Sequence, residues 1–124
     1  MTTMDNVAYL EDSDLDKNGN IINPDIPCNM PVLIMMQASW CPHCKHATPD
    51  FDKFAELYQG KVFCATIQSD GDRESEKALG KRIKENIKPN FRGFPDYALY
   101  IGCKRVNKEI SGRSVEDLKK FIGM

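Results

Sequence analysis

A continuous apolar run at residues 32–38 leads directly into the sequence Trp-Cys-Pro-His-Cys at residues 40–44. A run of this kind is typical of a strand that is buried on both faces of a parallel sheet. Residues 42–59 then follow a helical pattern, with apolar side chains at Phe51, Phe54, Ala55 and Tyr58 and a stop at Gly60. A buried strand that continues through a cysteine pair into a helix favours an α/β fold with the pair at the start of that helix.

The remaining segments continue the alternation of strands and helices. Residues 62–67 predict a second buried strand, and residues 72–88 predict an amphipathic helix whose apolar side chains are Leu79, Ile83 and Ile87. Residues 97–101 and 105–110 predict an antiparallel hairpin, and Ser114 resembles the cap of a last short helix. This order predicts a central mixed β-sheet flanked by helices on both faces.

Residues 11–31 lack apolar periodicity and are rich in Asp, Asn, Gly and Pro, which predicts a polar loop. We therefore expect a single domain over residues 1–124, in which residues 1–31 form an N-terminal strand and polar loop and residues 32–122 form the core. Within the loop, residues 14–25 place oxygen-bearing side chains at the spacing of a calcium-binding loop. No amphipathic helix flanks them, so a solvated turn is the favoured prediction over a calcium site.

Composition excludes several classes of function. The 124 residues carry a formal net charge of -1 with acids and bases interleaved, so we expect no nucleic-acid partner. The longest apolar run, VLIMM, is too short to span a bilayer, and the N-terminus lacks the pattern of a signal peptide. We expect a cytoplasmic monomer without a membrane partner, with packaging into a virus particle as the alternative location.

The cysteine pair has the spacing of a working dithiol. At the N-terminus of a helix, free amides and the helix dipole favour the thiolate of Cys41, which is the species that attacks disulfides. Cys44 lies one turn inside the helix and can resolve the mixed disulfide. His43, when protonated, further stabilises that thiolate and makes the oxidised pair a better oxidant. Pro42 suits the first helical turn and stiffens it.

Other readings of the pair are weaker. A zinc site built on Cys41, Cys44 and His46 lacks a second ligand pair, so no metal is expected. Haem attachment needs histidine directly after the second cysteine, where Lys45 stands. A purely structural disulfide is disfavoured in a reducing compartment.

Each of the other three cysteines has its own expected environment. Cys64 lies in a buried strand and is expected to be a small core residue. Cys103 lies in the hairpin turn, so we expect it to be exposed and open to glutathionylation or dimerisation. Cys28 lies in the polar loop, and a regulatory bridge from it to another cysteine stays open.

Several motifs together resemble the thioredoxin superfamily over about residues 30–122. They are WCPHCK at 40–45, Pro49, RGFP at 92–95, Gly102 in the hairpin turn and Gly112 before the last helix. The resemblance implies a thioredoxin fold and thiol–disulfide oxidoreductase activity on protein substrates. It implies that Cys41 is the nucleophile and Cys44 the resolving cysteine, without an organic cofactor but with a reductase or oxidant that recycles the pair.

The resemblance also implies a substrate-binding groove. Pro95 is similar to the cis-proline that faces the dithiol, and Phe94 before it would offer backbone hydrogen bonds to an extended substrate. Trp40 resembles the tryptophan that shields the pair. Trp40, Pro42, Phe94 and Pro95 are therefore the expected substrate-binding residues.

The sequence departs from the superfamily pattern at two positions behind the dithiol. Met35 stands where relatives with strong reductase or isomerase activity carry a buried Asp or Glu, and Thr66 stands where a lysine often accompanies it. We expect resolution by Cys44 to be slow and to rely on water or a histidine as proton acceptor.

The direction of the reaction stays open. The sequence CPHC matches the bacterial periplasmic disulfide oxidants, yet this chain lacks their helical insertion and a secretion signal. A redox-inactive adaptor with the same fold is one alternative function. A glutathione-dependent enzyme of the glutaredoxin kind is another, disfavoured because the residues around Pro95 and after Cys103 lack its usual glutathione-holding pattern.

Overall fold

A five-stranded mixed sheet forms the centre of the computed structural model, which describes residues 4–123. Its strand order is β1-β3-β2-β4-β5. The strands are β1 (Ala8–Tyr9), β2 (Val32–Gln37), β3 (Phe63–Gln68), β4 (Asp96–Ile101) and β5 (Lys104–Val106). The first three run parallel, while β4 is antiparallel to β2 and β5 is antiparallel to β4.

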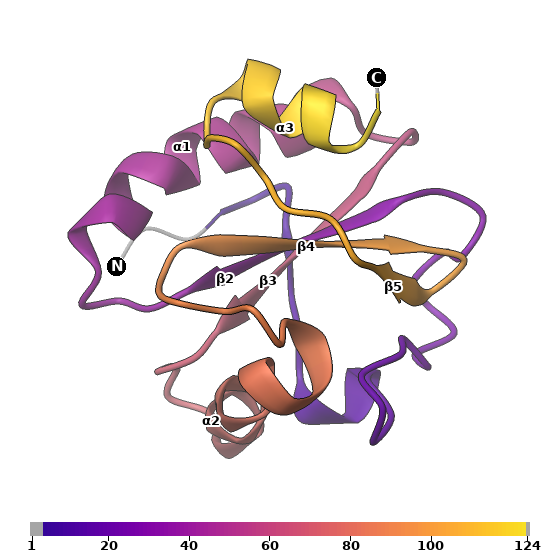
Figure 1. Cartoon of the computed structure of the whole chain (residues 1–124), viewed down its shortest axis with the longest axis vertical. Helices are drawn as coiled ribbons and strands as arrows, with labels where there is room; N and C mark the ends of the chain where they lie inside the picture. The colour runs from indigo at the N-terminus through magenta and orange to yellow at the C-terminus, as the bar shows by residue number, and fades with distance from the viewer. Residues whose placement is uncertain (1–3, 124) are drawn as a thin grey trace.

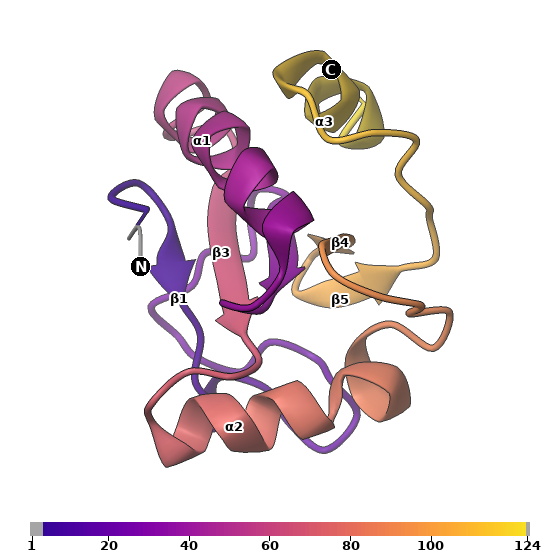
Figure 2. The same cartoon turned by 90° about the vertical axis from the view of Figure 1, so that its left-hand side faces the viewer.

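Helices cover both faces of this sheet. The helices α1 (Pro42–Leu57) and α3 (Val115–Phe121) lie together on one face, and α2 (Glu74–Lys81) lies on the other (Figures 1 and 2). The 3₁₀ turn η1 (Asp12–Asp14) contacts α2, and the π-helical turn η2 (Ile83–Ile87) follows α2. The predicted thioredoxin-type α/β fold is confirmed. Within the described residues, no helix is both long and apolar enough to cross a membrane.

The strand β2 lies at the centre of the core, and all six of its residues are buried. Val32, Ile34 and Met36 pack with Leu79 of α2 on one side of the sheet. Leu33 and Met35 pack on the other side, in a cluster that includes Phe51 and Phe54 of α1. Burial on both faces explains why this strand is apolar at every position up to Gln37.

The helix predicted over residues 72–88 is interrupted. The helix α2 ends at Lys81, and after Arg82 the chain forms the π-helical turn η2. Leu79, Ile83 and Ile87 are four residues apart, so they lie along one apolar stripe of a helix. The wider π-helical turn keeps all three buried. The predicted strand at residues 105–110 is also shorter, because β5 ends at Val106.

The segment at residues 11–31 is polar in composition but is anchored to the core. Leu15 and Ile21 pair in an isolated antiparallel bridge, and both pack with Ile26 in the cluster on the α2 side. From η2, Asn86 donates a hydrogen bond to the Lys17 carbonyl (2.8 Å). The three apolar anchors are six and five residues apart, which matches neither a helix nor a strand, so the sequence pattern did not reveal them.

Residues 14–25, which have the spacing of a calcium-binding loop, form a hydrogen-bonded turn. A carboxylate oxygen of Asp16 accepts the backbone amides of Asn18 (2.8 Å) and Asn20 (3.0 Å), and Asp14 accepts the Asn23 amide (2.7 Å). These carboxylates are occupied by the turn itself. In the part of the chain that the structure describes, no group of three or more acidic, histidine or cysteine side chains could hold a metal ion.

Candidate active site

The two cysteines of the dithiol lie where β2 leads into α1. Cys41 is the N-cap of α1, with an extended backbone, and Pro42 takes the first helical position. The backbone amide of Cys44 donates a hydrogen bond to Cys41 Sγ (3.1 Å). This amide has no carbonyl partner within the first turn, so the sulfur of Cys41 occupies an electropositive position. Both cysteines are in the thiol form and both are buried.

A loop 53 residues further along the chain completes the site. The thiol of Cys41 donates a hydrogen bond to the Phe94 carbonyl (3.4 Å), and the Phe94–Pro95 peptide bond is cis. The ring of Phe94 packs against a small cluster of Ala38, Cys41 and Cys44. The structure therefore brings together the dithiol and the proline loop that the sequence motifs suggested.

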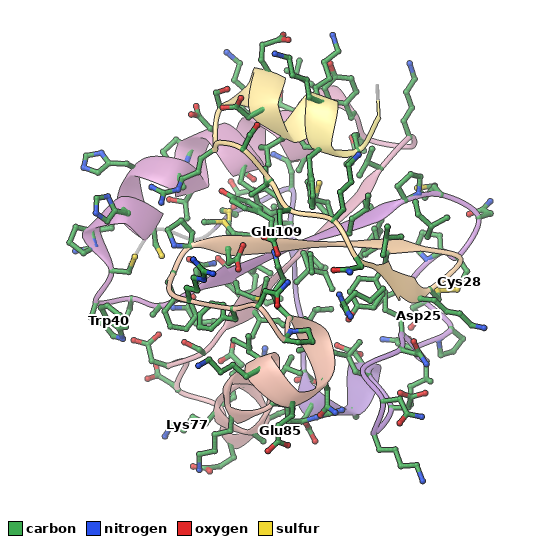
Figure 3. All side chains as sticks on the ribbon, viewed as in Figure 1. Asp25, Cys28, Trp40, Lys77, Glu85 and Glu109 are labelled. Atoms are coloured by element: carbon green, nitrogen blue, oxygen red, sulfur yellow. A yellow bond between two sulfur atoms is a disulfide. The ribbon has the colours of Figure 1, made fainter. Side chains whose placement is uncertain are left out.

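Aromatic side chains line the surface beside the dithiol. Trp40 is 68% exposed, and its ring meets Phe94 edge-on with centroids 5.8 Å apart. Phe91 contacts Phe94 in turn, at 4.9 Å. Figure 3 shows Trp40 at the edge of the molecule, beside the start of α1. Sequence reasoning missed Phe91, because residues 91–94 are not helical and a spacing of three does not predict a contact there. An exposed aromatic surface of this kind is typical of a docking site.

The two histidines and Pro42 lie on the exposed side of the first turns of α1. His43 and His46 are both exposed, as is Pro42. Cys41, Cys44 and Pro95 are buried behind this surface. The predicted site residues therefore divide into a buried set around the sulfur atoms and an exposed rim.

A buried lysine holds the Phe94–Pro95 loop in place. The ammonium group of Lys88 contacts the Asp96 carboxylate (3.1 Å) and the Glu109 carboxylate (3.0 Å), and it donates to the Tyr97 carbonyl (2.8 Å). The hydrogen bond from Lys88 is also the main reason that the pKa of Glu109 is lowered. Lys88 lies in a charged segment of the sequence, yet its side chain is only 4% exposed.

A cavity of about 610 Å³ opens next to this loop. It is lined by residues 90, 92, 93, 95–97 and 109–113. It thus joins the proline loop to the segment that precedes α3. The sequence did not predict it, because its two walls, residues 90–97 and 109–113, are separate segments of the chain that only the fold brings together.

The position behind Cys44 lacks a carboxylate, as the sequence indicated. Met35 and Thr66 are fully buried cross-strand neighbours. The Thr66 hydroxyl donates to the Met35 carbonyl (2.7 Å) and accepts from the Gln37 amide (2.8 Å). Burial raises the pKa of the Cys44 thiol to about 12, and its hydrogen bond with Cys41 adds to the effect. Cys44 is therefore hard to deprotonate in this state.

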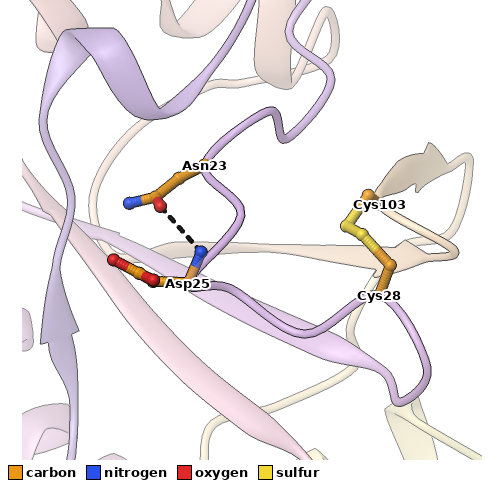
Figure 4. The surroundings of a disulfide bond; sticks show 4 residues. All are labelled: Asn23, Asp25, Cys28 and Cys103. Carbon is orange, nitrogen blue, oxygen red and sulfur yellow. Dashed lines mark hydrogen bonds between the residues drawn. A yellow bond between two sulfur atoms is a disulfide. The ribbon is translucent and has the colours of Figure 1, made fainter.

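A second cysteine pair is bonded at the far side of the molecule. Cys28 and Cys103 form a disulfide with a Cα–Cα distance of 5.0 Å (Figure 4). Figure 3 shows Cys28 at the side opposite Trp40. Cys103 is buried, so the prediction of an exposed, free thiol is wrong. The pair is 75 residues apart in sequence, so only the fold reveals it. Disulfides of this kind are typical of oxidising compartments, so a cytoplasmic location stays a prediction.

Buried thiols and phenols predict a loss of stability in alkali. Burial raises the pKa of Cys44, Cys64 and Tyr100 to about 12, against usual values of 9.0 for the thiols and 10.0 for the phenol. The unfolded chain therefore loses these protons first, and the folded state should lose stability as pH rises from about 9 to 12. The urea midpoint should be lower at pH 10.5 than at pH 8, and less so in Cys64→Val. Equal midpoints at the two pH values would contradict this assignment.

Comparison with known proteins agrees with this geometry. The family model described as Thioredoxin matches residues 22–124. This chain belongs to the thioredoxin family. A thioredoxin-like protein of Invertebrate iridescent virus 6, 453L, is 41% identical to this thioredoxin-family chain over 128 residues, covering 94% of the chain and 91% of that protein.

Disulfide isomerases are further relatives. Protein disulfide isomerase-like 2-2 of Oryza sativa subsp. japonica is 30% identical over 94 residues, covering 76% of this chain and 24% of that protein. Protein disulfide-isomerase erp38 of Neurospora crassa is 31% identical over 96 residues, covering 74% and 23%. The thioredoxin-family chain thus spans about a quarter of the length of these isomerases. Its family is one of thiol–disulfide oxidoreductases.

Solved structures share the fold at low sequence identity. Human ERp44 superposes with a TM-score of 0.70 at 18% identity, covering 98% of this chain and 29% of that chain. The Trx4 domain of ERdj5 superposes with a TM-score of 0.54 at 17% identity, covering 76% and 77%. These likenesses show that the thioredoxin fold of this chain is the same as theirs.

Proposed function

We propose that this thioredoxin-family chain exchanges disulfides with protein substrates through Cys41 and Cys44. The observation that carries the proposal is the hydrogen bond from the Cys44 amide to Cys41 Sγ at the start of α1. A negative charge on Cys41 sulfur would be stabilised there by this amide and by the helix dipole. His43 lies two residues after Cys41, on the exposed rim. When protonated, its ring would stabilise the Cys41 thiolate further.

The reaction has two displacement steps. The Cys41 thiolate attacks one sulfur of a substrate disulfide, so that a Cys41–substrate disulfide forms and the other substrate sulfur leaves as a thiolate. The Cys44 thiolate then attacks Cys41 Sγ. The substrate sulfur that was bonded to Cys41 leaves as a thiolate, and a Cys41–Cys44 disulfide remains. The reverse sequence oxidises a substrate dithiol, and a separate reductase or oxidant restores the starting form of the pair.

The Phe94 loop supplies the binding surface for an extended substrate. In the thiol form, the Phe94 carbonyl accepts from the Cys41 thiol. Once Cys41 has lost its proton, this carbonyl is free to accept a backbone amide of the substrate. The exposed ring of Trp40 and the partly buried ring of Phe94, which meet edge-on, would provide apolar contact for the substrate beside Cys41. Pro42 lies on the exposed rim of this surface, and Pro95 is buried behind it.

Trapping tests the proposal directly. A Cys44→Ser variant should accumulate a stable mixed disulfide with a protein substrate, because the second displacement cannot occur. Cys41→Ser is the matched control and should trap nothing. Equal trapping by the two variants would show that Cys41 is not the attacking residue.

The missing carboxylate predicts a gain of function at one position. In Met35→Asp, a carboxylate would lie in the cluster beneath α1 and could accept the proton of Cys44. We expect the resolution step to become about tenfold faster at pH 7, since general bases typically contribute 10²–10⁴-fold and burial limits this one. Stopped-flow release of substrate thiol would measure it.

Met35→Asn is the matched control for this variant. It has the same shape and polarity as Met35→Asp but no basic oxygen of comparable strength, so it should lose stability without a gain in rate. An unchanged rate in Met35→Asp would contradict the view that proton removal from Cys44 limits resolution.

A further inference from the structure

We infer that the hydroxyl group of Tyr97 donates a hydrogen bond to the Cys44 thiolate during resolution, which makes Tyr97 a positioning residue of the site. The inference rests on the proposed function of the cysteine pair. Tyr97 is fully buried, and in the described part of the chain its hydroxyl has no hydrogen-bond partner. Buried hydroxyls are nearly always paired, so an unpaired one next to a reactive group calls for a functional explanation.

The backbone places Tyr97 beneath the active-site helix. Tyr97 lies on β4 directly opposite Met35 of β2, on the side of the sheet that faces α1. Its ring packs against Phe51 of α1, with centroids 5.8 Å apart. Phe51 lies seven residues after Cys44, which is two turns along the same face of the helix. Tyr97 therefore lies under the helix face that carries Cys44.

Electrostatics agrees with this placement. Burial raises the pKa of Tyr97, Arg113 lowers it, and the nearby Cys44 raises it again. Asp50 of α1 and Asp96 of β4 are the other charged groups that act on Tyr97, and both raise its pKa further. Tyr97 thus keeps its proton throughout the range in which thiols react, and remains a hydrogen-bond donor.

The Tyr97 hydroxyl would act in the second displacement, in which Cys44 attacks the mixed disulfide at Cys41. Cys44 loses its proton to water, and its sulfur attacks Cys41 Sγ. The bond between Cys41 and the substrate sulfur breaks, and that sulfur leaves as a thiolate. Tyr97 keeps its proton throughout and donates a hydrogen bond to the developing thiolate of Cys44. This stabilisation does not require a carboxylate at position 35. A hydroxyl that lacks a partner in the thiol form gains one in the thiolate form.

Tyr100 provides a matched control on the same strand. It is also fully buried, but it faces the opposite side of the sheet, where its hydroxyl donates to the Gly19 carbonyl (2.7 Å). Tyr97→Phe removes an unpaired hydroxyl, whereas Tyr100→Phe removes a paired one. Tyr100→Phe should therefore lower stability, while Tyr97→Phe should fold at least as stably as the parent chain.

The test compares both variants in two kinetic measurements. In a Cys41→Ser/Cys64→Val background Cys44 is the only thiol, and its alkylation by iodoacetamide between pH 7 and 9 follows its thiolate fraction. In the parent background, substrate thiol release from a preformed Cys41 mixed disulfide measures resolution. A hydrogen bond to a charged group changes the thiolate population tenfold or more, and the lower nucleophilicity of a stabilised thiolate offsets about half of this on a logarithmic scale. Both rates should therefore fall at least about threefold in Tyr97→Phe.

The outcomes separate this inference from the proposed function. Unchanged rates in Tyr97→Phe, or equal losses in Tyr97→Phe and Tyr100→Phe, would overturn the inference. The alkylation measurement needs no turnover. A loss of Cys44 alkylation in Tyr97→Phe would therefore support the hydrogen bond even if the parent chain failed to exchange disulfides, a failure that would overturn the proposed function alone. The first displacement, by Cys41, should be unchanged in Tyr97→Phe.

Discussion

Replacing Cys41 by Ser is expected to slow disulfide exchange by a factor on the order of a thousand or more, because a serine hydroxyl does not ionise near neutral pH and is a poor nucleophile toward sulfur. The substitution changes one atom at the N-cap of α1, and serine is itself a favoured N-cap residue, so the helix should be retained. The rate at which the reduced protein cleaves a protein disulfide would measure the loss.

The second cysteine pair provides the control. In a Cys28→Ser/Cys103→Ser variant the dithiol is untouched, so exchange should continue at close to the parent rate. The variant should be less stable by about 4 kcal/mol, since the disulfide closes a loop of 75 residues. Circular dichroism checks that it is folded. If this variant lost exchange and Cys41→Ser kept it, the reactive pair would be Cys28 and Cys103.

The same Cys41→Ser variant distinguishes an enzyme from an adaptor. An adaptor with the thioredoxin fold would bind its partner through the surface around Trp40 and Phe94 and would not need the thiol. Retained binding together with unchanged activity in cells would favour the adaptor. Exchange with glutathione by Cys41 alone, without Cys44, would instead favour an enzyme of the glutaredoxin kind.

Gly19→Ala is expected to lower the free energy of unfolding by about 3 kcal/mol. Gly19 has a φ of +81°, a conformation that costs an L-residue about 1–2 kcal/mol. A Cβ atom there would also lie 1.9 Å from the carbonyl oxygen of Asn86 in η2. The loop would have to move away from η2, and the hydrogen bond between Asn86 and Lys17 would be weakened. The urea midpoint would measure the loss.

Two other glycines separate the contributions to this loss. Gly60 has a φ of +85°, but no heavy atom of residues 4–123 lies within 4 Å of its Cβ position, so Gly60→Ala should lose only the backbone part, about 1 kcal/mol. Gly93 does not have a positive φ, and its Cβ position has no neighbour within 4 Å in the described part of the chain, so Gly93→Ala should be nearly neutral. A loss at Gly19 no larger than at Gly60 would show that the contact with η2 is not tight.

The parts of the site that could be predicted are those that local signals determine. The apolar run of β2, the cysteine pair and the helical period of α1 follow one another in the chain, so the sequence predicted the junction at Cys41. The capping box of α3 was predicted in the same way, and Ser114 accepts the Asp117 amide at 3.1 Å. The Phe94–Pro95 loop was found only through its resemblance to a known motif.

The remaining features depend on contacts between distant residues. Lys88 stands in a charged segment, and nothing near it in the sequence indicates that Asp96 and Glu109 surround its ammonium group. The bond between Cys28 and Cys103 depends on how the segment before β2 packs against the hairpin turn. The burial of the Tyr97 hydroxyl without a partner depends on the packing of α1 over β4, so it can be recognised only in the folded structure. Long-range packing decides all three, and composition and periodicity do not report it.

The redox equilibrium of the Cys41–Cys44 pair in glutathione buffers tests the central claim most directly. Trp40 is the only tryptophan in the chain, and it lies beside Cys41 and opposite Cys28, so its fluorescence reports the dithiol rather than the second disulfide. We predict a reversible two-electron transition. A potential near about -270 mV would indicate a reductase, and one between about -180 and -120 mV an oxidant or isomerase. The absence of any reversible transition would contradict the proposed function.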